Sequence, residues 1–174
     1  MRVGQGYDAH RFGADRPLVL GGVAVPHDQG LLAHSDGDVL VHALCDALLG
    51  AAALGDIGRH FPDTDPANRD RPSLDFLRGI RALLEEGGWS VTNVDATILA
   101  QQPRLAPFMD KMRRNIAAAL GMDVGAVSVK ATTTEGLNAE GRGEGISAVA
   151  VASIMRKHAE GMPQSRGGRG DRRG

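Results

Sequence analysis

A carboxylate and an imidazole lie two residues apart near the start of the chain. The stretch GYDAH, residues 6–10, contains Asp8 and His10 in a Gly-rich segment that alternates loosely, as a strand does. Side chains at positions i and i+2 of a strand share one face, so Asp8 and His10 can converge on one point. A hard oxygen and a borderline imidazole nitrogen suit zinc or a similar divalent ion better than calcium. The pair predicts part of a metal site, for which a third ligand is required.

The third ligand is expected from a helix that follows the segment LLAHSDGD. His42 lies one turn beyond Asp38, where a helix packed on the strand can present it to Asp8 and His10. Three protein ligands leave a fourth position open, which is typical of a catalytic zinc rather than a structural one. A simpler explanation stays open for each residue. A D-x-H pair also arises by chance, while Asp38 is explained by helix capping and Cys45 by packing in the core.

Two further groups of residues have the chemistry to bind phosphate. Ser35 and the start of the same helix offer a hydroxyl and backbone N–H groups to an anion, and His34 can add a proton. The hydroxyls of Thr132–Thr134 can donate to phosphate oxygens while Glu135 holds a hard cation such as magnesium. Arg142 lies between glycines, where it can reach a phosphate. Taken alone, these residues have simpler explanations, of which the ordinary N-cap is favoured for Ser35; an exposed threonine face and a simple turn explain the others.

The elements that must position these residues follow from hydrophobic periodicity. Residues 2–12 predict a strand, and residues 18–25 predict a hairpin that turns at two glycines. Ser35 is expected to cap a helix of about 15 residues that ends near Gly55, with Asp38 at the third position of a capping box. The Gly-, Asp- and Pro-rich segment 55–66 predicts a working loop without regular structure.

The remaining pattern predicts a helix from residue 73 to the glycines at 87 and 88, a strand over 90–100, a helix over 109–120, and strands over 126–135 and 146–155. This order favours an α+β fold, or a mixed α/β one, with one mixed sheet and helices packed on one face. Residues 1–157 are expected to form a single domain. Residues 158–174, rich in Gly and Arg, are expected to be a disordered tail.

Composition and charge exclude several classes of protein. The formal net charge is −1, but residues 163–174 carry +3, which leaves the preceding residues at about −4. A nucleic-acid-binding protein would carry a basic face instead. The single cysteine, Cys45, is compatible with a reducing compartment. The sequence has no secretory signal pattern and no apolar stretch long enough to span a membrane, so we expect a cytoplasmic protein without membrane attachment.

Five blocks of sequence, taken in order, closely resemble the 2-C-methyl-D-erythritol 2,4-cyclodiphosphate synthase family of the non-mevalonate isoprenoid pathway. They are GQGYDAH, LLAHSDGDVLVHAL, GDIGRHFPDTDP, VKATTTE and GRGEGI, and the resemblance covers about residues 1 to 157. It implies that the 2-phosphate of a cytidine diphosphate-linked substrate attacks the β-phosphorus of the same molecule and expels CMP. It also implies a homotrimer with each active site between two subunits, a hydrophobic cavity on the threefold axis, and possible contact with other enzymes of the pathway.

The resemblance implies a role for each candidate residue. Asp8, His10 and His42 match the zinc ligands, and Glu135 matches the residue that binds a second ion, magnesium or manganese. His34 and Thr133 match positions that stabilise the transition state. The residues expected to bind substrate are Asp8, His10, His34, Ser35, Asp56, Ile57, Gly58, Phe61, Pro62, Asp63, Thr64, Asp65, Ala100, Gln101, Gln102, Pro103, Arg104, Leu105, Ala106, Thr132, Thr133, Thr134, Glu135, Ala139 and Arg142. Among these, residues 56–58 are expected to hold the sugar, 61–65 to cover the methylerythritol phosphate, and 100–106 to read the cytosine.

Two positions depart from the family pattern. Ala139 stands where relatives often carry an aromatic residue that lines the axial cavity, and Arg104 replaces a frequent lysine near the nucleotide. Two other functions compete with the synthase. One is a different zinc-dependent enzyme that transfers phosphoryl groups or cleaves phosphodiesters on a nucleotide. The other is a metal-bound oligomeric scaffold.

Overall fold

The computed structural model describes residues 1–157 and contains one mixed sheet with its main helices on one side. The sheet has five strands in the order β4-β1-β7-β5-β6, and β2 and β3 form a separate hairpin. The strands are β1 (Arg2–Gly13), β2 (Leu18–Leu20), β3 (Val23–Val25), β4 (Gly30–Leu31), β5 (Trp89–Leu99), β6 (Val127–Thr132) and β7 (Gly145–Arg156). Strands β5 and β6 are parallel, and the other neighbours in the sheet are antiparallel.

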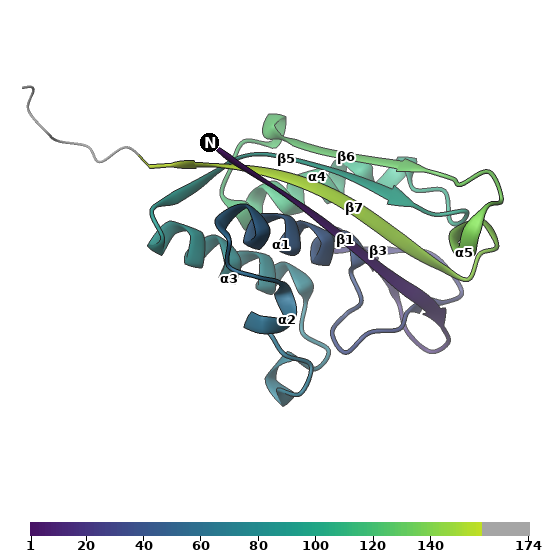
Figure 1. Cartoon of the computed structure of the whole chain (residues 1–174). Helices are drawn as coiled ribbons and strands as arrows, with labels where there is room; N and C mark the ends of the chain where they lie inside the picture. Colours follow the sequence, from purple (N-terminus) through teal and green to yellow (C-terminus); the bar gives the residue numbers. More distant parts are fainter. Residues whose placement is uncertain (158–174) are drawn as a thin grey trace, which may run out of the picture.

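The three long helices lie on the same face of this sheet, as Figure 1 shows. The helices are α1 (Val39–Ala52), α2 (Ile57–His60), α3 (Ser73–Glu86), α4 (Met109–Leu120) and α5 (Asn138–Gly141), with 3-10 turns at Pro66–Asn68, Ala106–Phe108 and Val124–Ala126. Helix α1 packs directly on β1 and β7, and α3 lies between α1 and α4. The expected α+β fold, with a mixed sheet and helices on one face, is confirmed.

Helix α1 and strand β1 are in backbone contact because β1 carries glycines where the two elements cross. A Cβ atom added at Gly4 would lie 2.1 Å from the carbonyl oxygen of Ala47, and one added at Gly6 would lie 2.1 Å from that of Ala43. No side chain fits at either position. Side chains alternate along a strand, so Asp8 and His10 point to the same helix-covered face as these glycines. The close packing therefore brings His42 of α1 beside them.

The start of α1 differs from the prediction that Ser35 caps it. Asp38 is the N-cap, and its carboxylate accepts hydrogen bonds from the backbone N–H groups of Val41 at 3.1 Å, Gly21 at 2.9 Å and Gly22 at 2.7 Å. Asp38 is completely buried, and these three donors offset part of the cost of burying its carboxylate. Asp38 is thus the cap because the N–H groups of the β2–β3 turn, about 17 residues earlier in the chain, also bind its carboxylate.

The end of α1 and the segment that follows it also differ from the prediction. Helix α1 ends at Ala52 with Ala53 in the left-handed conformation, before Gly55 is reached. The segment 55–66, predicted as a loop without regular structure, contains the short helix α2. Asp56 caps α2 by accepting from the N–H of Arg59 at 3.0 Å, and Asp46 of α1 accepts from the N–H of Ile57 at 2.7 Å. The carboxylate of Asp46 therefore fixes the start of α2 against α1.

The sheet face opposite the helices is open and partly apolar in the single chain. Side chains that remain exposed there include Val3 and Tyr7 of β1, at 59% and 56%, and Val151 and Met155 of β7, at 40% and 42%. Strands β1 and β7 are hydrogen-bonded neighbours, so these side chains share one surface. A row of this kind is typical of a surface that another protein chain covers.

None of the helices in the described part of the chain is long and apolar enough to cross a membrane. The predicted tail, residues 158–174, lies outside the described residues.

Candidate metal centre and adjoining pockets

Three side chains from β1 and α1 meet as the sequence predicted. Nδ1 of His42 lies 3.0 Å from Oδ2 of Asp8, Nε2 of His10 lies 3.0 Å from the same oxygen, and the two nitrogens are 3.1 Å apart. A tetrahedral zinc ion with bonds of about 2.0–2.1 Å places its ligand atoms about 3.3–3.4 Å apart. The observed triangle is only slightly smaller than one face of that tetrahedron. Asp8, His10 and His42 are therefore able to hold a divalent metal ion, and His10 and His42 also line an adjoining cavity.

The electrostatics of this cluster favour a charged carboxylate beside the imidazoles. Burial raises the pKa of Asp8, but hydrogen bonds with His10 and His42 outweigh it and hold that pKa far below its usual value. Burial lowers the pKa of His42, but the hydrogen bond and charge of Asp8 outweigh it and raise that pKa overall. Asp8 is thus ionised at any physiological pH, as a metal ligand must be.

A cavity of about 410 Å³ adjoins the cluster and is lined by several of the predicted substrate residues. Its walls are His10, Ala33, His34, Ser35, His42, Ile57, Gly58, Phe61, Pro62, Asp63, Asn68 and Phe76. Three residues of the predicted segments 56–58 and 61–65 lie outside that wall. Asp56 caps α2, Asp65 accepts from the N–H of Ala67 at 3.0 Å at the start of a 3-10 turn, and Thr64 lies between the two segments.

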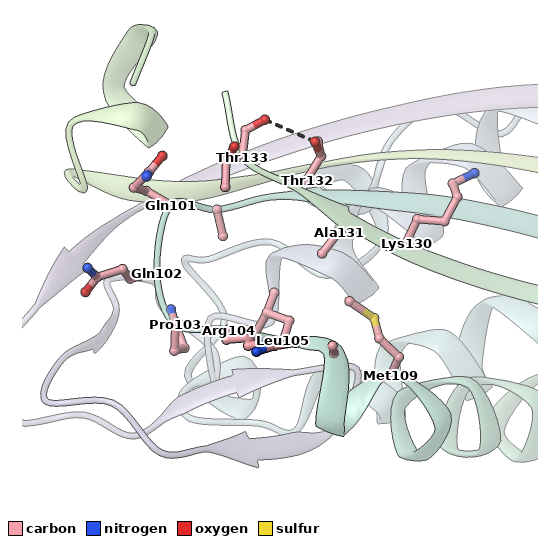
Figure 2. A pocket seen from close by; sticks show the side chains of 12 residues that line it. Gln101, Gln102, Pro103, Arg104, Leu105, Met109, Lys130, Ala131, Thr132 and Thr133 are labelled. Carbon is pink, nitrogen blue, oxygen red and sulfur yellow. Dashed lines mark hydrogen bonds between the residues drawn. The ribbon is translucent and has the colours of Figure 1, made fainter. Parts of the chain in front are cut away.

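A second cavity, of about 640 Å³, opens where β5 and β6 end, as Figure 2 shows. All seven residues of the predicted cytosine segment, 100–106, line it, together with Met109, Lys130, Ala131, Thr132 and Thr133. Figure 2 places the loop from Gln101 to Leu105 opposite the end of β6, so that the two sides enclose the pocket. Backbone N–H and C=O groups of such a loop can read the edge of a base. This cavity shares no lining residue with the one beside the metal cluster.

The predicted second metal ligand is not part of the Asp-His-His cluster. Glu135 has a left-handed backbone with φ 54° and accepts a hydrogen bond from Oγ1 of Thr133 at 3.0 Å. Thr134 donates to the carbonyl of Leu137 at 2.5 Å, and Arg142 pairs with Glu144 at 2.6 Å. Ala139 lines a third cavity, of about 200 Å³, that also reaches His10. Within the single chain these residues do not converge with His42.

Several residues that support the site carry no signal in the sequence. Nη1 of Arg16 donates to the carbonyl of Ala33 at 2.5 Å, and its Nη2 donates to that of Ser35. The carbonyl of His34 between them accepts from the N–H of Asp70 at 3.0 Å. Three consecutive carbonyls around His34 are thus fixed by distant groups. These contacts join segments far apart in the chain, so no local spacing could have revealed them.

Fold and site together define a class: an α+β enzyme domain with an Asp-His-His candidate centre for a divalent metal between strand and helix, next to pockets sized for a small ligand. The model of the YgbB family matches residues 1–155. The chain therefore belongs to the YgbB family.

Curated relatives of the chain share one name. The chain is 61% identical over 154 residues to the 2-C-methyl-D-erythritol 2,4-cyclodiphosphate synthase of Syntrophomonas wolfei, covering 88% of this chain and 98% of the relative. It is 60% identical over 155 residues to the synthase of the same name from Pseudomonas aeruginosa, covering 89% and 99%.

Solved structures agree with the fold. A bifunctional IspDF from Campylobacter jejuni superposes with a TM-score of 0.86 at 44% identity, and the match covers 89% of this chain but only 42% of that longer protein. The IspF from Plasmodium falciparum in complex with CDP superposes with a TM-score of 0.78 at 34% identity, covering 90% and 96%. The resemblance predicted from five sequence blocks is confirmed.

Proposed function

We propose that this chain is a lyase of isoprenoid biosynthesis that converts 4-diphosphocytidyl-2-C-methyl-D-erythritol 2-phosphate to 2-C-methyl-D-erythritol 2,4-cyclodiphosphate and CMP. An oxygen of the 2-phosphate forms a bond to the β-phosphorus, and the bond from that phosphorus to the oxygen of the α-phosphate breaks, so CMP leaves with the electron pair. The observation that carries this proposal is the Asp8–His10–His42 triangle beside a cavity lined by His34, in a chain 61% identical to a named synthase.

Two divalent ions belong to the proposal. Asp8, His10 and His42 would hold zinc, and Glu135 would bind magnesium or manganese at the substrate diphosphate. When bound, such ions neutralise phosphate charge and polarise the phosphorus centre. The protein itself orients the reacting groups. In this proposal His34, which lines the cavity beside the metal cluster, and Thr133, which lines the cavity at the ends of β5 and β6, would stabilise charge on the transferring phosphoryl group.

The two larger cavities support a division of the substrate between them. The cavity of residues 100–106 would hold the cytosine through backbone groups, with Thr132 and Arg104 nearby. The cavity beside the metal cluster, which Ser35, Ile57, Gly58, Phe61, Pro62 and Asp63 help to line, would hold the methylerythritol phosphate. Thr134 and Arg142 would contact phosphate, and Ala139 would stand at the position that lines the axial cavity in relatives.

A homotrimer with sites between subunits accounts for two features of the single chain. The cavities share no lining residue, and β1 and β7 expose the apolar side chains Val3, Tyr7, Val151 and Met155 on the open sheet face. Covering this face with another copy would remove it from water. We also infer a cytoplasmic location, supported by one buried free cysteine, Cys45. The bifunctional Campylobacter protein supports contact with another enzyme of the pathway.

The decisive experiment incubates the full chain with the cytidyl substrate, zinc and magnesium and follows products by phosphorus NMR. CMP and a cyclic diphosphate are expected to appear together. CMP without the cyclic product would replace the proposal with a nucleotide phosphodiester-cleaving enzyme, and no reaction would refute it.

His42→Ala separates an enzyme from a scaffold. This variant is expected to lose turnover while remaining a folded oligomer by circular dichroism and size-exclusion chromatography. Unfolding on metal loss would favour the scaffold instead. The matched control is His27→Ala, because the His27 ring stacks on Phe12 with ring centroids 4.8 Å apart and lines none of the cavities described above.

A further inference from the structure

The ring of His42 is held on both sides, and only one side faces the metal cluster. Nδ1 faces Asp8 and His10, whereas Nε2 lies 2.9 Å from Oγ of Ser73 and 3.1 Å from Oγ of Ser35. Ser73 is the first residue of α3 and has no exposed surface. Its hydroxyl donates to Oδ1 of Asp36, and its backbone N–H donates to Oδ2 of the same carboxylate at 2.9 Å. A chain of contacts therefore runs from His42 through Ser73 to Asp36.

The direction of the protons along this chain follows from what each group can do. An ionised carboxylate only accepts, so the one hydroxyl proton of Ser73 is committed to Asp36. The oxygen of Ser73 must then accept the proton carried by Nε2 of His42. When a metal ion displaces the proton that Nδ1 shares with Asp8, this arrangement keeps the remaining proton on Nε2 and leaves the lone pair of the neutral ring on Nδ1, the nitrogen that points at Asp8 and His10. It is the tautomer that a metal ion at the cluster requires.

The same atoms also resemble a hydrolytic triad, and two observations exclude that role for Ser73. The contacts Ser73 Oγ to His42 Nε2 at 2.9 Å and His42 Nδ1 to Asp8 Oδ2 at 3.0 Å have the order of a Ser-His-Asp arrangement. A nucleophile must reach substrate, but Ser73 is completely buried and lines neither of the two large cavities. Its proton is given to Asp36 rather than to His42.

We propose that Ser73 and Asp36 are positioning residues of the metal centre: they fix the tautomer and orientation of His42 and thereby raise its affinity for the ion. This inference rests on the metal site of the proposed function. Second-sphere partners of a metal-bound histidine commonly change metal affinity by about 10–100-fold. The negative charge of Asp36, passed on through the Ser73 hydroxyl, also makes Nδ1 a stronger donor.

The test measures zinc affinity directly, by competition with a chromophoric chelator at constant pH, on the full chain and without substrate. Ser73→Ala is expected to bind zinc about 10–100-fold more weakly than the wild type. Asp36→Asn keeps an acceptor for the Ser73 hydroxyl but loses the charge, so a smaller loss in the same direction is expected. Cobalt(II) substituted for zinc gives a second readout, because a ring held less firmly alters the visible absorption bands of the ion.

The control is Ser153→Ala, which removes a hydroxyl that lies 2.7 Å from Oγ1 of Thr92 in the sheet, away from the metal cluster. It is expected to keep wild-type zinc affinity and cobalt spectrum. Melting temperatures with excess chelator identify a variant that is simply unfolded, and Asp36→Asn then carries the test.

The outcomes separate two failures. Wild-type protein that binds no zinc refutes the metal site of the proposed function. Wild-type protein that binds zinc, with Ser73→Ala within twofold of it and an unchanged cobalt spectrum, refutes only the positioning role. If Ser35→Ala loses more zinc affinity than Ser73→Ala, the positioning role of Ser73 is also refuted, because Ser35 would then accept the proton on Nε2 of His42.

Discussion

The substitution Gly6→Ala is expected to pull the three candidate metal ligands apart although it changes none of them. The new Cβ atom would lie 2.1 Å from the carbonyl oxygen of Ala43, and ordinary contacts begin near 3.4 Å. Both atoms belong to backbone or are fixed to it, so α1 must move away from β1 by about 1.3 Å. His42 moves with α1, while Asp8 and His10 stay with β1.

The consequence for the ligand triangle can be worked out. A shift of that size along the line from Asp8 to His42 would lengthen the present 3.0 Å distance to about 4.3 Å. Zinc bonds of about 2.0–2.1 Å span at most about 4.2 Å even when two ligands lie on opposite sides of the ion. Removal of a supporting residue alone commonly weakens metal binding by about 10–100-fold. Zinc affinity should therefore fall by at least that factor. The overpacked interface should cost about 1–3 kcal/mol of unfolding free energy.

The matched control is Gly50→Ala, which lies on helix α1, the other side of the same contact. A Cβ atom there has a single neighbour within 4 Å, the carbonyl oxygen of Gln5 at 3.9 Å. Alanine in a helix interior is favoured over glycine by about 0.5–1 kcal/mol, so this variant should be slightly stabilised and keep its zinc affinity. Chelator competition and urea unfolding measure both quantities. A Gly6→Ala protein with wild-type zinc affinity would refute the claim that this contact sets the ligand geometry.

Three further outcomes are expected. Zinc affinity should fall by up to about tenfold per pH unit as the pH drops below the raised pKa of His42, because the ion competes with a proton, whereas Asp8 stays ionised. With chelator present, the pH dependence of stability has the opposite sign. The stability that comes from the raised pKa of His42 is complete below about pH 6.5 and is lost as the pH rises through the folded-state pKa. Melting temperatures at pH 6 and pH 8 should therefore differ in opposite directions with and without zinc. Arg16→Ala removes both carbonyl contacts beside His34, so turnover should fall on the order of 10-fold to 100-fold with zinc affinity unchanged; parallel losses of both would contradict this. Asp38→Asn offers one acceptor oxygen in place of two and should lose about 1–3 kcal/mol in urea unfolding. Burial raises the pKa of Asp38 to about 6, and the charge of Asp36 adds to this effect. The neutral acid therefore favours the folded state, and this contribution to stability is lost as the pH rises through 6. Asp38→Asn should lack that part of the pH dependence of stability.

The ligand set was predictable because its geometry is local or nearly so. The pairing of Asp8 with His10 follows from the two-residue repeat of a strand, whereas His42 was one candidate on the following helix and was assigned by the family resemblance. The fold class followed from the order of elements for the same reason. The segment 100–106 lines a cavity as expected, but its role was implied by family resemblance, because nothing in the spacing of AQQPRLA indicates a pocket.

What could not be predicted depends on contacts between distant segments. Ser35 and Asp38 are both good capping residues, and the choice of Asp38 is made by the N–H groups of Gly21 and Gly22. Ser73 looks like an ordinary helix start until its partner Asp36, 37 residues earlier, is placed beside it. Arg16 has no motif at all. Long-range hydrogen bonds such as these leave no periodic trace in the sequence.

The positive charge that a substrate of this kind needs is scarce among the residues of the two cavities. Arg104 and Lys130 line the larger cavity, but Lys130 pairs with Asp95 at 2.5 Å; Arg142 lines neither cavity and pairs with Glu144 at 2.6 Å. The described body of the chain carries an excess of acidic residues, and the metal cluster contributes a further carboxylate, Asp8. A substrate with several phosphate charges would be repelled by such a surface without counter-charge. In the proposed function, divalent ions bound at the Asp8–His10–His42 cluster and at Glu135 would therefore supply most of the attraction for the substrate.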